Sequence, residues 1–151
     1  MSFEMLPFLL VALLIGAIAP IQAGVNATIA QFHGHPLYAA LTNTLVASLV
    51  LLVVILFLRL PLPLVANLTL APWWAWTGGV LGAILVLSSL VLAPKLGAAV
   101  FVSTTIVGTM VASLLIDHFG LLAYKPQPIT AQRVIGAVMV VGGMLLIQWK
   151  R

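Results

Sequence analysis

The chain has 151 residues, of which 64% are hydrophobic and only 5% carry a charged side chain. An ordinary soluble domain has about 25% charged residues, so this composition excludes a water-soluble globular protein. Six basic and two acidic side chains give a formal net charge of +4. The basic residues lie near the ends of apolar segments, where they mark membrane boundaries and do not indicate nucleic-acid binding. The sequence has no cysteine, which excludes disulfides and thiol chemistry.

Five long apolar segments follow one another, each near the roughly 20 residues that cross about 30 Å of hydrocarbon as a helix. Strands would leave backbone groups unpaired in lipid, and no alternating pattern of about ten residues indicates a barrel. The sequence therefore predicts an all-α integral membrane protein, with five transmembrane helices in a single domain over residues 1–151. The predicted helices span residues 5–28, 37–58, 73–92, 96–116 and 133–149.

The first predicted helix begins like a signal peptide but lacks the charge of one. Ala17-Ile18-Ala19 mimics a cleavage site. However, the segment before it has Glu4 and no Lys or Arg, which is the wrong charge for the start of a signal peptide, and Pro20 follows the site directly. We therefore expect this segment to remain as a membrane helix.

The same helix carries two amides in the stretch PIQAGVN, residues 20–26. Gln22 and Asn26 are four residues apart and share one helix face. Pro20 removes the amide bond to residue 16, so it can kink the helix and free the Gly16 carbonyl. Amides are costly in hydrocarbon and must face protein, water or ligand. They either line a polar cavity beside the kink or hydrogen-bond neighbouring helices, with Asn26 already near the headgroups.

Polar residues also occur in the second and fourth predicted helices. Serine and threonine are weak evidence for a cavity, because their hydroxyls can bond the preceding turn of their own helix. Asn43 is stronger evidence, because its amide is not satisfied so easily. The candidate substrate-binding residues are Gln22, Asn26, Asn43, Ser103, Thr104 and Thr109.

The third and fifth predicted helices carry glycine. Gly78 and Gly82 form a small-xxx-small pair, which is more typical of close helix packing than of ligand contact. The tryptophans near the helix ends are typical of the aromatic belt at the membrane interface.

Few side chains can titrate inside this membrane protein. The two carboxylates, Glu4 and Asp117, are both near helix ends, so a proton-coupled mechanism has only these candidates, with His118 beside the second. A hydrated helix terminus is the competing interpretation of Asp117 and His118. His33 and His35 lack a third ligand, so no metal site is expected. No nucleophile has a matching base, so the sequence predicts neither an enzyme nor a cofactor.

The basic residues are divided equally between the two sides that five helices define. One side holds Arg59, Lys125 and Arg133, and the other holds Lys95, Lys150 and Arg151. Because Lys and Arg asymmetry sets membrane orientation, this balance favours insertion in both orientations. We therefore expect an antiparallel homodimer, a ten-helix unit with the inverted halves that many transporters have. A single fixed orientation would instead favour a related partner chain inserted the other way. The competing explanation of the equal numbers is that a chain this small carries too few charges to show a bias.

Six stretches together resemble a known family along the whole chain. They are GAIAPIQAGVN at 16–26, GHP at 34–36, WWAWTGGVLGA at 73–83, APKLGAA at 93–99, IDHFGL at 116–121 and RVIGAVMVVGG at 133–143. The chain resembles the five-helix YdcZ-like branch of the drug/metabolite transporter superfamily. This resemblance implies a bacterial inner-membrane protein, similar in architecture to small multidrug resistance exporters and to half of a ten-helix EamA-type transporter.

The resemblance extends to individual positions and fails at others. Gly16, Pro20, Gln22 and Asn26 match the first-helix pattern of the family, and Asp117 matches the end of its fourth helix. Relatives often have Ser-Phe at 43–44 and Gly-Gln at 108–109, so the substrate cannot be transferred from them. Small multidrug exporters carry a carboxylate where this chain has Gln22, so proton coupling through that residue is not expected.

These observations predict a secondary transporter that exports or exchanges small organic metabolites or drug-like solutes by alternating access. The alternatives are a structural or accessory membrane subunit, a passive channel, and one half of a heterodimeric transporter. The expected partners are the lipid bilayer, a small-molecule substrate and a second copy of the chain.

Overall fold

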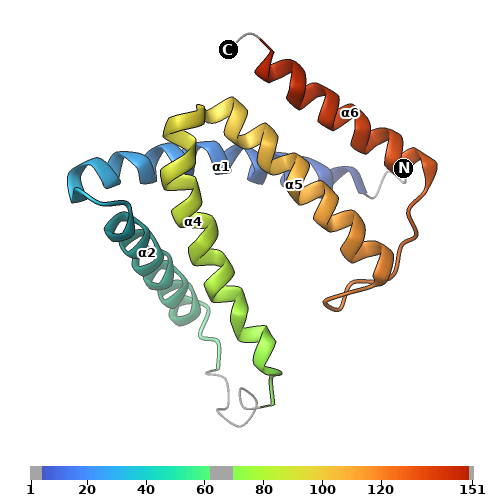
Figure 1. The fold of residues 1–151 in the computed structure, drawn as a ribbon. Coiled ribbons are helices and arrows are strands. Elements are labelled where there is room, and N and C mark those ends of the chain that lie inside the picture. The colour runs from blue at the N-terminus through green and yellow to red at the C-terminus, as the bar shows by residue number, and fades with distance from the viewer. Residues whose placement is uncertain (1–4, 62–69, 150–151) are drawn as a thin grey trace. The chain divides into compact units, whose positions relative to one another are not determined.

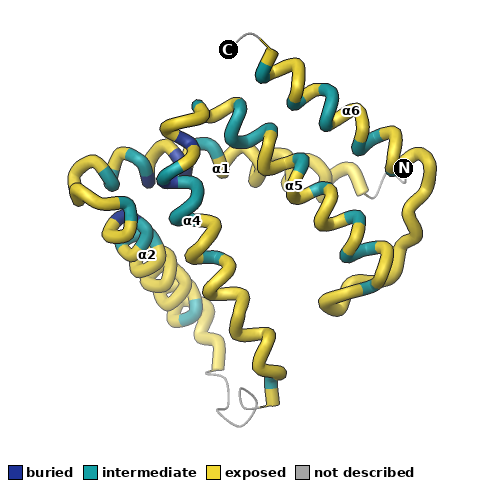
Figure 2. Tube along the Cα trace, in the orientation of Figure 1, coloured by how far each residue is buried: buried dark blue, intermediate teal, exposed yellow. Residues whose placement is uncertain are grey.

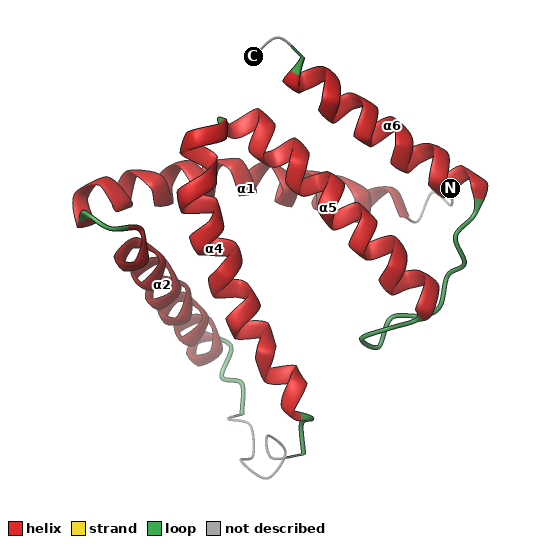
Figure 3. Cartoon of the chain, viewed as in Figure 1, coloured by secondary structure: helices red, strands yellow, loops and turns green. Residues whose placement is uncertain are grey.

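The computed structural model describes residues 5–61 and 70–149. Glu4, Lys150 and Arg151, which entered the titration and charge predictions, lie outside these ranges. Within the described ranges every regular element is a helix (Figures 1 and 3). The elements are α1 (Leu6–His33), α2 (Pro36–Phe57), the short 3₁₀ helix η2 (Trp73–Trp76), α4 (Thr77–Leu96), α5 (Ala98–Phe119) and α6 (Ala131–Gln148). Five helical segments, with η2 and α4 counted as one, are long and apolar enough to cross a membrane, which confirms the all-helical prediction.

The chain is divided into two compact units, residues 1–95 and 96–151. In the first unit α1 packs against α2, and in the second unit α5 packs against α6. The predictions of a single transmembrane domain and of an antiparallel dimer are not tested by this division and stay predictions.

The first helix is longer than predicted. α1 runs through Pro20 as one helix and ends at His33, five residues beyond the predicted end at Thr28. Gly34 ends it with φ 71°, a left-handed conformation that glycine adopts without strain. His35 then caps α2, because its Nδ1 accepts a hydrogen bond of 3.2 Å from the Leu37 amide. The GHP stretch is therefore a tight corner between two helices.

The predicted end of the third helix was also wrong. The third helix was predicted to span residues 73–92, but α4 continues through Pro94 and ends at Leu96. Proline removes only one helical hydrogen bond, and the helix stops only before Gly97, which takes φ 80°. α5 likewise ends before a left-handed glycine, Gly120, with φ 60°. α6 begins at Ala131, because the Thr130 hydroxyl caps it by accepting from the Arg133 amide at 3.4 Å.

Very little of the described chain is buried (Figure 2). The buried apolar residues of these segments are Ala23, Ala39, Leu90 and Ala93, all in the first unit. Large apolar side chains along every span are exposed instead. An apolar surface of this extent must be covered by lipid or by another protein chain, as expected of membrane helices.

Candidate functional site

Asn26 is the one buried polar residue in the described ranges. Only 4% of its surface is exposed. Its side chain forms no hydrogen bond with another described residue. In these segments, every side-chain nitrogen or oxygen that is completely buried has a hydrogen-bond partner, so the polar atoms of Asn26 are not completely buried. The Asn26 amide is therefore nearly enclosed and unpaired, and it keeps a narrow opening to its surroundings.

Small neighbours on α1 explain why Asn26 is enclosed. Ala23 is buried, and Ala27 and Ala30 are half-buried, so positions 23, 26, 27 and 30 form one stripe of the helix. Small side chains allow a neighbouring helix to approach closely. Gln22 lies at the edge of this stripe and is exposed. The structure thus encloses one of the two predicted amides and leaves the other on the surface.

A cavity of about 390 Å³, open to its surroundings, lies between α2 and α4 within the first unit. Its lining residues are Leu37, Ala40, Leu41, Thr44, Val80, Ala83, Ile84 and Leu87. Thr44 is the only polar residue among them, and its hydroxyl donates to the Ala40 carbonyl at 3.0 Å. The cavity is therefore almost purely aliphatic. Neither Asn26 nor the half-buried Asn43, which precedes Thr44, is among the residues that line it.

The predicted packing glycines lie on α4, near this cavity in the sequence. Gly78 is exposed and Gly82 is half-buried. A Cβ at either residue would meet no described atom within 4 Å, and the same holds for Gly16 on α1. Contacts among the described residues therefore do not require glycine at these positions. Close helix packing at Gly78 and Gly82 stays a prediction.

The other predicted polar residues belong to the second unit, on α5. The Ser103 hydroxyl donates to the Val100 carbonyl at 3.1 Å, so it is satisfied within its own helix. The Thr104 hydroxyl accepts a hydrogen bond of 3.3 Å from Gln148 on α6. Thr109 is exposed. Gln148 was missed by the sequence analysis, although an amide in the last turn of an apolar helix is itself a signal.

Asp117 ties the end of α5 to the start of α6. Its carboxylate lies 3.4 Å from the Arg133 guanidinium, and both side chains are about 30% exposed. Its backbone carbonyl accepts a hydrogen bond of 2.7 Å from the Gln127 amide. Arg133 in turn donates to the backbone carbonyl and to the side-chain oxygen of Gln127. Three residues therefore clamp the loop between the two helices.

The same loop is fixed at two further points. His118 Nδ1 accepts a hydrogen bond of 3.4 Å from the Ile129 amide. Pro126 packs so closely on Gly120 that a Cβ there would lie 2.7 Å from Pro126 Cγ. Asp117 and His118 thus organise a loop in this structure. No group of three or more His, Asp or Glu residues in the described segments is arranged to hold a metal ion.

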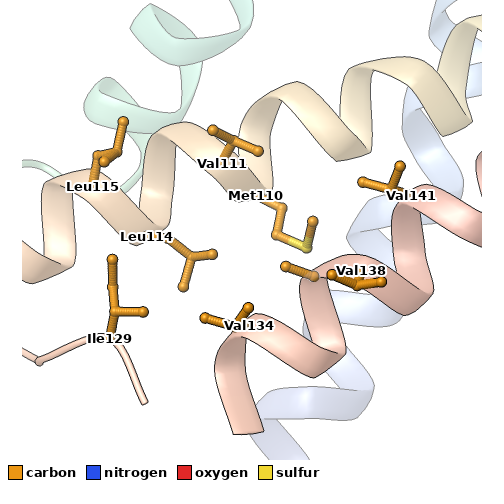
Figure 4. A pocket seen from close by; sticks show the side chains of 9 residues that line it. Met110, Val111, Leu114, Leu115, Ile129, Val134, Val138 and Val141 are labelled. Atoms are coloured by element: carbon orange, nitrogen blue, oxygen red, sulfur yellow. The ribbon is translucent and has the colours of Figure 1, made fainter. Parts of the chain in front are cut away.

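A second cavity, of about 340 Å³, lies between α5 and α6 (Figure 4). Its lining is entirely apolar: Met110, Val111, Leu114, Leu115, Ile129, Val134, Ala137, Val138 and Val141. Figure 4 shows side chains of both helices lining the space, with Ile129 of the loop at one end. None of these residues was among the candidates predicted from the sequence.

Comparison with protein families identifies the chain. The model of a family described as "Putative inner membrane exporter, YdcZ" matches residues 7–146. This range includes the second, third and fourth spans completely and nearly all of the first and the fifth. The chain belongs to the YdcZ family. It is therefore a multi-pass protein of the inner membrane, in a transporter family of the drug/metabolite transporter superfamily. No curated protein and no solved structure is significantly similar to it.

Proposed function

We propose that this YdcZ-family chain is a secondary transporter that exports or exchanges small organic metabolites or drug-like solutes by alternating access, without a catalytic step. Membership of an exporter family supports transport. The observation that carries the proposal is the enclosed Asn26 amide without a partner. An unpaired amide in hydrocarbon raises the free energy of the folded protein, so we expect Asn26 to have a function that outweighs this cost. Hydrogen bonding to a transported solute is such a function.

The depth of Asn26 supports this proposal. α1 has 28 residues and is about 42 Å long at 1.5 Å per residue, more than the hydrocarbon thickness of about 30 Å. If the middle of α1 lies at the bilayer midplane, Asn26 is roughly 10 Å from that plane along the helix. This depth is inside the hydrocarbon and favours a cavity residue over a headgroup residue.

The proposed site is centred on Asn26. The half-buried amide of Asn43 and the aliphatic cavity between α2 and α4 belong to the same unit as Asn26. A further proposed substrate contact in the same unit is Gln22. The predicted contacts Ser103, Thr104 and Thr109 lie on α5 of the second unit and stay predictions from the sequence. Of these, Ser103 has a hydroxyl already bonded within α5, so it is the weakest candidate.

The proposed assembly is an antiparallel homodimer with dual topology. The equal division of basic residues between the two sides supports it, and so does the exposed apolar surface of the spans. A reporter fused to the carboxyl terminus should be found on both sides of the membrane. One fixed location would contradict the homodimer and favour pairing with a related chain of opposite orientation.

Flux through proteoliposomes tests the transport proposal. A panel of labelled metabolites and drug-like solutes should include at least one that shows saturable counterflow. Asn26→Leu should then reduce this counterflow at least tenfold. The matched control is Gln31→Leu, which removes an exposed amide from the same helix and should leave the rate unchanged. Normal counterflow in Asn26→Leu would contradict the site, and a panel without any saturable flux would favour an accessory subunit.

A further inference from the structure

We propose that the solute carried by this site is electrically neutral, with an aliphatic or aromatic body and one group that both donates and accepts hydrogen bonds. The proposal rests on the proposed function and names its substrate class. Three observations carry it: the distribution of charge along the chain, the lining of the cavity between α2 and α4, and the unpaired amide of Asn26.

Charged side chains are nearly absent from the spans of the first unit. No Asp, Glu, Lys or Arg occurs from Leu6 to Phe57 or from Trp73 to Pro94. Arg59 follows α2, and Lys95 is in the last turn of α4. The whole sequence has two acidic residues, and one of them, Asp117, is paired with Arg133. Apart from Lys95 at the end of α4, the first unit therefore offers no acidic or basic side chain within its spans.

Moving an ion into such a site is unfavourable. Even after relaxation, the transfer of an unpaired ion into a protein interior costs several kcal/mol, unless an opposite charge and further hydrogen bonds compensate for it. Aromatic faces can stabilise a cation instead. The cavity between α2 and α4 has only aliphatic side chains and Thr44, so it lacks aromatic faces as well. A cation and an anion are thus both disfavoured there.

A neutral solute matches the groups that are present. The Asn26 amide has one oxygen that accepts and one nitrogen that donates, and neither is used within the described chain. An amide or a hydroxyl of a solute can pair with both. The Thr44 hydroxyl already donates to Ala40, so it offers a solute only its lone pairs. The cavity volume of about 390 Å³ is near the lower end of the usual range for ligand pockets, which favours a small molecule.

Matched sets of solutes test the charge preference directly. Each set has one skeleton in neutral, anionic and cationic form, for example nicotinamide, nicotinate and 1-methylnicotinamide. Further sets use aliphatic skeletons. Counterflow of each labelled solute is measured in proteoliposomes and in protein-free liposomes. We expect saturable, protein-dependent counterflow of neutral members only, at rates at least tenfold above those of their charged counterparts.

Two substitutions test whether Asn26 determines the charge preference. Asn26→Asp keeps the shape of the side chain and adds a carboxylate, so it should shift the preference toward the cationic member of a set. Gln31→Glu adds a carboxylate at an exposed position of the same helix and should leave the preference unchanged. An equal shift in both variants would overturn the assignment of the preference to Asn26.

The outcomes separate the substrate class from the proposed function. Saturable counterflow of a charged member at or above the rate of its neutral counterpart would overturn the neutral class, while the protein would still be a transporter. No saturable counterflow of any member would overturn the proposed function itself, and the substrate class with it. If Asn26→Asp fails to assemble, the comparison of the three charge forms with the unmodified protein still decides the question.

Discussion

Replacement of Asn26 by leucine should stabilise the protein, although Asn26 is the most enclosed polar residue within residues 5–61 and 70–149. An unpaired amide in a buried position costs about 1–3 kcal/mol. The Asn26 amide keeps a narrow opening, through which water can relieve part of this cost. Leucine has a similar branched shape, has no polar atoms, and gains from burial. We therefore expect Asn26→Leu to raise the free energy of unfolding by about 1 kcal/mol, the lower end of that range.

The measurement is reversible unfolding in mixed micelles, with sodium dodecyl sulfate as the denaturant and helicity as the signal. It should be repeated at several protein concentrations, because dimerisation makes stability depend on concentration. Gln31→Leu is again the control for a general effect of added hydrophobicity on α1.

The sign of the change tests the reasoning. If Asn26 instead bonds a second chain, its loss should cost about 0.6 kcal/mol, the average for a hydrogen bond between membrane helices. A destabilised Asn26→Leu variant would therefore refute the view that this amide is unpaired in the assembled protein. A stabilised variant that no longer transports would show that stability is given up at this position for function.

Two further predictions concern helix ends. Gly120→Ala should destabilise the protein by about 2–4 kcal/mol, because a left-handed conformation and the contact with Pro126 Cγ act together. Gly34→Ala, with φ 71° and no described atom within 4 Å of the new Cβ, should cost only about 1–2 kcal/mol, and equal melting temperatures of the two variants would contradict this. For Asp117→Asn and Arg133→Gln, a double-mutant cycle of unfolding should give a coupling of about 0.2–1 kcal/mol, because both side chains are partly exposed. Additive effects would show that the ion pair does not contribute.

The five spans could be predicted from the sequence, because the bilayer restricts the choice of structure. Length and hydropathy identify the spans, and unpaired backbone groups in lipid exclude most alternatives to a helix. The ends were harder to predict. α1, α4 and α5 are each followed by a glycine with positive φ, namely Gly34, Gly97 and Gly120. The third helix was predicted to end before Pro94, but proline removes a single hydrogen bond while the others hold the helix together.

The candidate site was predictable only in part. The cost of an amide in hydrocarbon identified Gln22 and Asn26, but it does not say which of them is enclosed. The small residues Ala23, Ala27 and Ala30 decide this, since they form one stripe with Asn26. The ion pair between Asp117 and Arg133 was missed, because the two residues were considered on separate helices. Opposite charges at the end of one helix and the start of the next were the available signal.

The exposed amide of Gln22 is evidence about assembly. If the middle of α1 lies at the bilayer midplane, Gln22 is roughly 4 Å from that plane along the helix. Lipid can cover the apolar side chains around it, but lipid tails offer no hydrogen bond to an amide. A second copy of the chain, or water in a cavity that it encloses, can satisfy this group. Gln22→Leu should therefore weaken dimerisation by about 0.6–2 kcal/mol if Gln22 bonds the partner, measured by energy transfer between labelled chains diluted in bilayers. Unchanged dimerisation with lost counterflow would instead place Gln22 beside Asn26 on the wall of a water-filled cavity.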